Sequence, residues 1–166
     1  VHVIGKDITR FHCIIWPAML LAADIAPPKR VFPHGFVYLA GEKISKSGKR
    51  LDPAKVADRF GGDPLRYFLL REIGFDNDGD FTWEKFVERF NGELANGLGN
   101  LLNRVVSMTE KNLGGLFEGG AAPLPQDGAL KERLCSLVDR VAPHFDAFAY
   151  HFALNEIFEA VYQANR

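Results

Sequence analysis

Cysteine is scarce in this chain: Cys13 and Cys135 are the only two among 166 residues, and each falls within an apolar helical pattern. We interpret them as buried structural thiols, which fits a reducing, cytoplasmic compartment. Long hydrophobic runs are also lacking, since none approaches the roughly 20 apolar residues of a transmembrane helix, and this predicts no membrane partner. The first residues, VHVIGKDITR, place apolar positions before charges, which is the reverse of a secretory signal.

Net charge is small as well, at -1 for the whole chain, but it is unevenly divided. Residues 1–75 hold twelve Lys and Arg against seven Asp and Glu, whereas residues 76–166 hold eight against fourteen. The basic excess is greatest between Lys29 and Arg50, where six basic residues accompany the single acid Glu42. This asymmetry places the chemistry that handles polyanions in the first half of the chain.

The first fifty residues alternate between strand-like and helical patterns. A β-branched run at 1–5 predicts a buried strand, the apolar spacing over 7–23 predicts a helix capped by Asp7, and 31–40 predicts a second strand. Pro33 within that second run indicates an edge, a bulge or a close approach to ligand. A strand, a crossover helix and a second strand make a βαβ unit, which calls for parallel strands.

After residue 50 the sequence predicts helices and the loops between them. The expected helices span 54–60, 64–72, 82–113, 129–148 and 152–166. We expect Asp52, Asp63 and Thr82 to cap the helices that follow them. Glycines inside the longest helix lower its intrinsic stability, so we expect close helix–helix contact to compensate.

A basic loop follows the second strand, and residues 43–47 within it read Lys-Ile-Ser-Lys-Ser. Two lysines three residues apart, with small neighbours, can converge on one oligophosphate and neutralise charge that develops on it. Ser45 and Ser47 add hydroxyl donors. A solvated basic loop is the other interpretation that length alone leaves open, whereas a P-loop is excluded because its G-x-x-x-x-G-K-[ST] pattern does not occur.

This loop resembles the Lys-Met-Ser-Lys-Ser signature of class I aminoacyl-tRNA synthetases, with isoleucine at the apolar position. In that family the loop closes over ATP and stabilises the pyrophosphate that leaves as the amino acid attacks the α-phosphate. The resemblance implies that Lys43 and Lys46 are catalytic and that Ser45 and Ser47 contact ATP.

The segment from Gly5 to Leu20 is more discriminating, because it closely resembles the corresponding segment of methionyl-tRNA synthetases, including its His and its Trp-Pro-Ala. An aspartate just beyond the carboxyl end of a strand lies where α/β sheets bind nucleotides, and its carboxylate can accept both ribose hydroxyls. The resemblance implies that Gly5 and Asp7 contact the ATP ribose. It also implies a methionine pocket, whose aromatic rings and apolar wall suit a thioether, lined by Ile8, His12 and Trp16.

The strand that leads into the lysine loop matches the same family through its sequence Phe-Pro-His-Gly-Phe-Val at 32–37. The resemblance implies that the backbone from Gly35 to Val37 flanks the adenine of ATP, with His34 beside it. A His-Gly pair at the end of a strand is also common in turns, and that is the alternative interpretation.

The helical half carries the candidate tRNA contacts, through its resemblance to the first long helix of an anticodon-binding bundle. Asn100 and Arg104 are four residues apart and therefore share one helical face. An amide and a guanidinium can read the base edges of an unstacked anticodon loop, and the resemblance implies that role. Ordinary polar residues on an exposed face are the alternative interpretation.

Three aspartates at 76, 78 and 80 resemble the start of a calcium loop. An EF-hand needs glycine at its sixth position and glutamate at its twelfth, and this run has Gly79 fourth and Val87 twelfth. We therefore interpret the aspartates as capping and solvated residues.

The resemblance also implies the fold class and the domain organisation. Residues 1–50 correspond to the α/β C-terminal half of a Rossmann-type nucleotide-binding domain, with short parallel strands and a crossover helix. Residues 51–81 correspond to a stem-contact region, and residues 82–166 to part of an all-α helical bundle that binds the anticodon. The N-terminal half with its His-Ile-Gly-His signature is not in this sequence, so we expect these residues alone to be inactive.

The function implied is ATP-dependent activation of methionine and its transfer to tRNA(Met), with L-methionine, ATP and tRNA(Met) as partners. Mg²⁺ would accompany ATP; no residue of this chain is assigned as a metal ligand, because zinc is expected only in a connective insertion that the sequence lacks. Two alternatives stay open: a class I synthetase for isoleucine, leucine, valine or cysteine, and a non-catalytic tRNA-binding relative.

Overall fold

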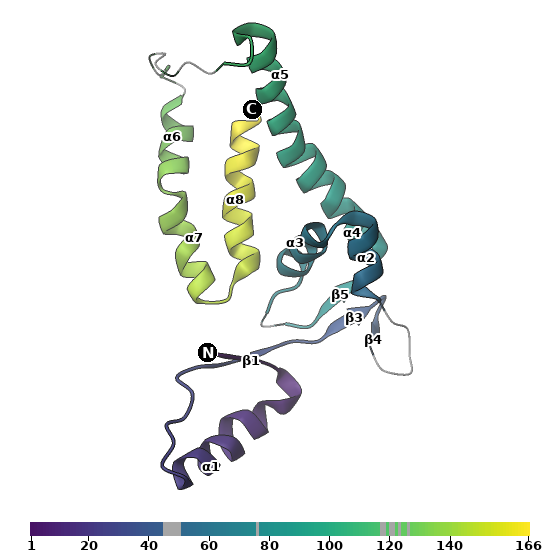
Figure 1. Cartoon of the computed structure of the whole chain (residues 1–166), viewed down its shortest axis with the longest axis vertical. Helices are drawn as coiled ribbons and strands as arrows, with labels where there is room; N and C mark the ends of the chain where they lie inside the picture. The colour runs from purple at the N-terminus through teal and green to yellow at the C-terminus, as the bar shows by residue number, and fades with distance from the viewer. Residues whose placement is uncertain (45–50, 76, 117–118, 120–121, 123, 126) are drawn as a thin grey trace.

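The computed structural model describes residues 1–44, 51–75, 77–116, 119, 122, 124–125 and 127–166. An α/β part lies at one end and the C-terminal helices lie at the other, with further helices between them (Figure 1). The order of elements along the chain follows the predicted change from α/β to helical structure. Short parallel strands with helices, followed by a helical region, are therefore confirmed.

Two short parallel strands form the N-terminal part, β1 (His2–Gly5) and β2 (Val31–His34). Their register places Gly5 directly opposite His34. The predicted connecting helix is present in three consecutive pieces: a 3-10 turn Lys6–Ile8, a π-helical segment Phe11–Ile15 and α1 (Trp16–Ala22). The helix begins after Gly5, and no side chain caps it, so the predicted cap at Asp7 is wrong.

The predicted second strand divides at Gly35, and its two halves belong to different sheets. The second half, β3 (Val37–Leu39), lies between an antiparallel and a parallel neighbour, β4 (Glu42–Lys43) and β5 (Gly79–Phe81). Gly35 is held against the loop before β5, where an added Cβ would lie 2.1 Å from the carbonyl oxygen of Asn77. Residue 50, the expected domain boundary, thus lies in the sequence between β4 and β5, which belong to the same sheet.

Three helices pack on this second sheet and enclose the core, namely α2 (Pro53–Phe60), α3 (Gly62–Glu72) and α4 (Trp83–Arg89). The largest fully buried side chains are phenylalanines from three different elements: Phe68, Phe81 and Phe86. Their rings meet at centroid distances of 5.1 to 5.7 Å, with edge-to-face and tilted geometries that favour aromatic packing.

Two of the three predicted helix caps are confirmed. Asp52 accepts a hydrogen bond from the amide of Ala54 at 3.1 Å, and Thr82 accepts one from the amide of Lys85 at 3.3 Å. Asp63 does not cap α3, because that helix begins at Gly62, one residue before it, and follows Gly61, which has a φ of 93°.

The long predicted helix is continuous, since α4 runs into a π-helical segment (Phe90–Gly99) and then into α5 (Asn100–Leu113). The remaining helices are α6 (Asp127–Cys135), α7 (Leu137–Asp146) and α8 (Tyr150–Ala164). Helix α8 packs against α7, α3 and the π-helical segment (Figure 1). The predicted close helix–helix contact is present at one glycine of that segment, because a Cβ at Gly97 would lie 3.6 Å from the ring of Tyr162 on α8.

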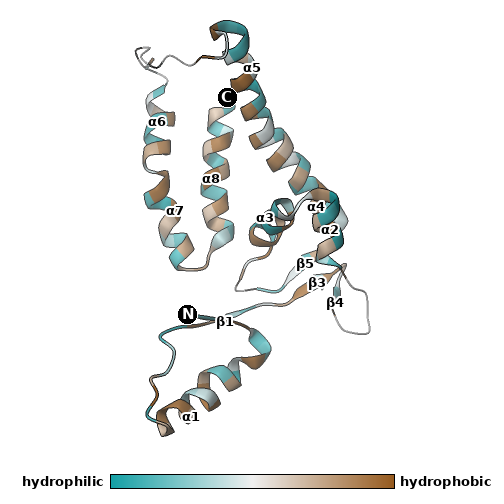
Figure 2. Ribbon diagram, in the orientation of Figure 1, coloured by the Kyte–Doolittle hydropathy of each residue, from teal (hydrophilic) through white to brown (hydrophobic). Residues whose placement is uncertain are grey.

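Apolar side chains are exposed along the outer helices, and Figure 2 shows hydrophobic stretches on α1 and α5. Cys13 and Cys135 are both exposed in this chain, so the prediction that they are buried is wrong. An apolar helical pattern fixes the face on which a residue lies, but burial requires a second element opposite that face. Within the described part of the chain, no helix is long and apolar enough to cross a membrane.

Candidate functional site

The carboxyl ends of β1 and β2 bring four of the predicted ATP-binding residues to one edge. Because Gly5 pairs with His34, the two strands end side by side, and Asp7 follows one strand end and Gly35 the other. The carboxylate of Asp7 folds back over Gly5, where an added Cβ would lie 2.7 Å from its Oδ1 atom. Asp7 itself is exposed, so its carboxylate is accessible to a ligand at this edge.

An ion pair closes the same edge, and the sequence interpretation missed it. The ammonium of Lys6 lies 2.6 and 2.7 Å from the two carboxylate oxygens of Asp78, and 5.0 Å from the ring centroid of Phe36. Asp78 also accepts a hydrogen bond of 2.8 Å from the amide of Phe36. Its carboxylate thus joins the loop before β5 to the ends of β1 and β2, which is more than the capping or solvation expected of it.

The turn that leads into the lysine loop has its own support. Ala40 and Gly41 both have positive φ, at 50° and 78°, and Asp80 accepts hydrogen bonds of 3.0 and 3.1 Å from the amide of Gly41. This turn starts β4, whose backbone includes Lys43. The other candidates of the loop, Ser45, Lys46 and Ser47, lie outside the described residues, as does Asp76.

Two of the predicted methionine-binding residues lie against each other. The rings of His12 and Trp16 have a centroid separation of 5.4 Å, and both face His2, which lies 6.3 Å and 5.0 Å away respectively. Ile8 lies four residues before His12, at the end of the 3-10 turn, and is 38% exposed. The sequence analysis did not assign His2 to this site. Its position could have been predicted in part, because His2 and Ile4 are two residues apart on a strand and therefore lie on the same face of the sheet.

The remaining candidates near the adenine have different surroundings. Val37 is partly buried and packs against the core around Phe68. His34 makes a contact of 2.8 Å between its Nδ1 atom and the carbonyl oxygen of Gly35. Together with α3 and the loop that follows it, these strand residues line an apolar cavity of about 280 Å³.

The predicted anticodon residues, Asn100 and Arg104, are both exposed on α5. The guanidinium of Arg104 donates a hydrogen bond of 3.3 Å to the carbonyl oxygen of Asn165, at the end of α8. The Asn165 amide in turn donates 3.1 Å hydrogen bonds to the carbonyl oxygens of Gly97 and Val161. The end of α8 therefore holds both the π-helical segment and one candidate tRNA contact.

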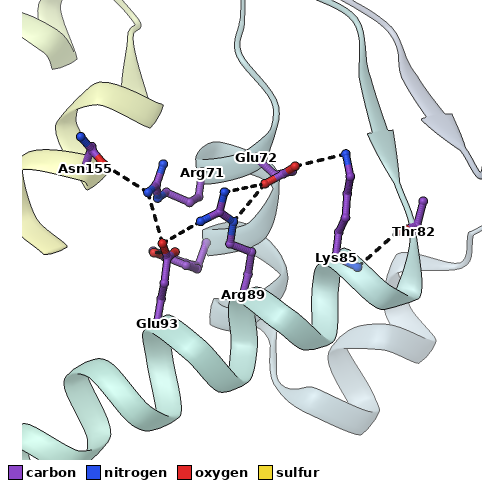
Figure 3. A network of polar contacts seen from close by, with 8 residues as sticks. Arg71, Glu72, Thr82, Lys85, Arg89, Glu93 and Asn155 are labelled. Atoms are coloured by element: carbon purple, nitrogen blue, oxygen red, sulfur yellow. Dashed lines mark hydrogen bonds and ion pairs between the residues drawn. The ribbon is translucent and has the colours of Figure 1, made fainter.

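A buried carboxylate lies where α3, α8 and the π-helical segment meet (Figure 3). Glu93 is 7% exposed and accepts hydrogen bonds from Arg89 at 2.7 Å, from Arg71 at 3.2 Å and from the hydroxyl of Tyr67. Arg71 also donates to the side chain of Asn155 on α8 at 3.2 Å. The sequence analysis did not identify this cluster. The feature that could have indicated it is Glu93, a charged residue on the apolar face of a helix, four positions after Arg89.

These contacts shift the pKa values of the groups involved. Burial, followed by the hydrogen bond to Glu93, raises the pKa of Tyr67 well above its ordinary value of 10.0. Burial also raises the pKa of Glu72, but the hydrogen bonds and charges of Arg89 and Lys85 outweigh this effect and lower the pKa below its ordinary value of 4.5. Glu72 is therefore charged and Tyr67 protonated at neutral pH.

Comparison with known proteins identifies relatives of one kind. The family model described as tRNA synthetases class I (M) matches residues 1–106. A methionine–tRNA ligase of Mycobacterium tuberculosis is 47% identical over 166 residues, and one of Brucella suis is 45% identical; each alignment covers 99% of this chain and 32% of the relative. The chain thus spans about a third of the length of the curated relatives it matches.

Solved structures agree with the sequence relatives. Mycobacterium tuberculosis methionyl-tRNA synthetase bound by methionyl-adenylate superposes with a TM-score of 0.95 at 44% identity, and its apo form with a TM-score of 0.89 at the same identity. Both comparisons cover 99% of this chain and 32% of the other. Since the family model covers more than half of the chain, these residues belong to the methionyl-tRNA synthetase family of class I tRNA synthetases.

Proposed function

We propose that this chain supplies one wall of an adenylate-forming site, together with tRNA contacts, in a methionine–tRNA ligase. That enzyme activates methionine with ATP, releases pyrophosphate, and transfers the methionyl group to tRNA(Met). The observation that carries the proposal is the pairing of Gly5 with His34, which brings Asp7 and Gly35 to one edge of a parallel strand pair. The His12–Trp16 ring pair lies against His2 of the same strand pair. The names of the relatives support the choice of methionine.

Residues 1–50 would form the C-terminal half of a Rossmann-type domain. The parallel β1–β2 pair with its crossover helix supports this, because such sheets bind nucleotides beyond the carboxyl ends of their strands. Residues 51–81 would form the stem-contact region and residues 82–166 part of the anticodon-binding bundle.

Each candidate residue has a role in this scheme that follows from its chemistry. The exposed carboxylate of Asp7 would accept the two ribose hydroxyls, and the rings of His12 and Trp16, with Ile8, would enclose the thioether of methionine. When a carboxylate oxygen of methionine attacks the α-phosphorus, the bond to the bridging oxygen breaks and pyrophosphate leaves with the charge. Lys43 and Lys46 would neutralise that charge, with Ser45 and Ser47 as hydroxyl donors.

Magnesium would arrive bound to the triphosphate. Among the described residues, no group of three or more His, Cys, Asp or Glu side chains could hold a metal ion by itself. Mg²⁺ keeps most of its waters and favours phosphate oxygens, so this chain needs no dedicated cage for it.

Amino-acid-dependent ATP–pyrophosphate exchange by the full-length protein tests the proposal. We expect exchange with methionine and none with isoleucine, leucine, valine or cysteine. Replacing Asp7 by asparagine should lower exchange at least tenfold, whereas Asp24→Asn, at an exposed aspartate beyond α1, serves as the matched control and should not. Exchange with another of these amino acids, or none at all in a protein that still binds tRNA, would contradict the proposal and favour one of its alternatives.

Asn100 and Arg104 would contact the anticodon. Their exposure on one face of α5 supports this role. We expect Arg104→Ala to weaken aminoacylation of tRNA(Met) and to leave methionine-dependent exchange unchanged. A parallel loss of both activities would instead indicate that Arg104 matters only for folding.

A further inference from the structure

The helical bundle touches the α/β part directly, through the turn between α7 and α8. The phenyl ring of Phe148 in that turn stacks on Phe32 of β2 at a centroid distance of 4.5 Å and an interplanar angle of 24°. Two more rings extend the contact: Phe75, 5.6 Å from Phe32, and Tyr150, 5.2 Å from Phe75. We name these rings, together with Arg30, the turn contact.

Arg30 adds a polar component to the turn contact. Its guanidinium lies 4.8 Å from the centroid of the Phe148 ring, in cation–π range. Its Nη1 atom donates a hydrogen bond of 2.7 Å to the carbonyl oxygen of Asp146, the last residue of α7. The carboxyl end of a helix carries partial negative charge, so a cation is stabilised there. Arg30 thus binds two parts of the same turn from the start of β2.

The turn is shaped for this contact. Phe148 has a φ of 59°, in the left-handed region that a bulky side chain rarely adopts. Backbone strain of this kind persists only where surrounding contacts determine it. The strained backbone places the ring of Phe148 in contact with both Arg30 and Phe32.

Helix α8 extends from this turn to the predicted anticodon face. It has 15 residues, which gives a length of about 22 Å at 1.5 Å per residue. Three of its side chains, Ala153, Phe158 and Ala160, are buried, so the helix is fixed along its length. At its far end Asn165 accepts the hydrogen bond from Arg104. One rigid helix therefore connects β2 to a candidate tRNA contact.

We propose that Arg30 and Phe148 are positioning residues for tRNA charging. Through the turn contact they fix the placement of α8, and with it Arg104, relative to the strand that ends at His34. They touch neither ATP nor methionine in the proposed function, so they should affect the transfer to tRNA and not the formation of adenylate. The kinetic part of this inference rests on the proposed function, whereas the geometric part does not.

Kinetics of the full-length protein test the first part. In Arg30→Ala and Phe148→Ala, kcat/KM for aminoacylation of tRNA(Met) should fall at least fivefold, while methionine-dependent exchange stays within twofold of wild type. Affinity for an isolated anticodon stem-loop should not change, because the anticodon face itself is intact. Arg30→Lys should recover part of the loss, since it keeps the cation. The matched control is Arg140→Ala, which removes an α7 arginine that pairs with Glu156 inside the bundle.

A distance measurement tests the second part without any enzyme assay. Cys13 lies in the α/β part and Cys135 at the end of α6, and both are exposed in this chain. With any other cysteine of the full-length protein replaced, spin labels on these two should give one narrow distance distribution in wild type and in Arg140→Ala. The distribution should broaden in Arg30→Ala and in Phe148→Ala.

Three outcomes would overturn the inference. They are unchanged distance distributions in both variants, aminoacylation at the wild-type rate, and a parallel loss of exchange and aminoacylation, which would make Arg30 a support of the catalytic sheet. A wild-type protein without methionine-dependent exchange would instead refute the proposed function, and the distance distributions would still decide whether the turn contact fixes α8.

Discussion

Replacing Glu93 by alanine removes the carboxylate that Arg71 and Arg89 share. The Glu93 side chain is 9% exposed, and those of Arg71 and Arg89 are 16% and 33% exposed, so the charges left behind are only partly hydrated. Removing one partner of a buried ion pair costs about 3–5 kcal/mol. Arg89 keeps its contact with Glu72 at 3.0 Å, and it is the most exposed of the three. We therefore expect a loss near the lower limit, about 3 kcal/mol.

Urea unfolding followed by circular dichroism and by tryptophan emission measures this loss, provided that the two transitions coincide. In a thermal scan the same change should lower Tm by about 10 °C. Tyr67→Phe alone should cost about 1–2 kcal/mol, because it leaves a buried carboxylate oxygen without one donor. In the Glu93→Ala background it should cost less, since its partner is already gone.

The matched control is the exposed pair of Arg66 and Asp63, whose side chains are 76% and 93% exposed. Arg66→Ala should leave unfolding unchanged, because exposed pairs are solvated and screened. A loss below about 1 kcal/mol in Glu93→Ala would refute the reasoning, since it would place the cluster among such solvated pairs.

Three further predictions follow from single positions. Gly35→Ala should lower methionine-dependent exchange in the full-length protein, because its Cβ would lie 2.1 Å from the backbone of Asn77 and displace the strand end. Phe81→Ala, at a side chain with no exposure, should destabilise the protein by about 3–5 kcal/mol in urea titrations. Arg89 helps to lower the pKa of Glu72, so the ionised Glu72 stabilises the fold above pH 4.5, and this stabilisation is lost as pH falls through the lowered pKa. Glu72→Gln should therefore remove this contribution to the decrease of Tm at acidic pH.

Local patterns in the sequence predicted the parts of the fold that depend on neighbours in the chain. The caps at Asp52 and Thr82 and the continuous helix from residue 83 to 113 follow from short-range hydrogen bonding and helical periodicity. The βαβ rule also predicted the parallel pairing that brings Gly5 opposite His34. Periodicity alone did not predict burial, and both cysteines are exposed despite their apolar surroundings.

The sequence by itself determined which residues are candidates for the site, because the segment from Gly5 to Trp16 and the lysine loop are each contiguous. Only the tertiary structure decided how distant residues pair: Lys6 with Asp78, 72 residues apart, and Arg30 with the carbonyl of Asp146, 116 residues apart. No local propensity encodes such pairs, since they form only when whole elements have packed. The placement of α8 between β2 and Arg104 is therefore a property of the folded chain.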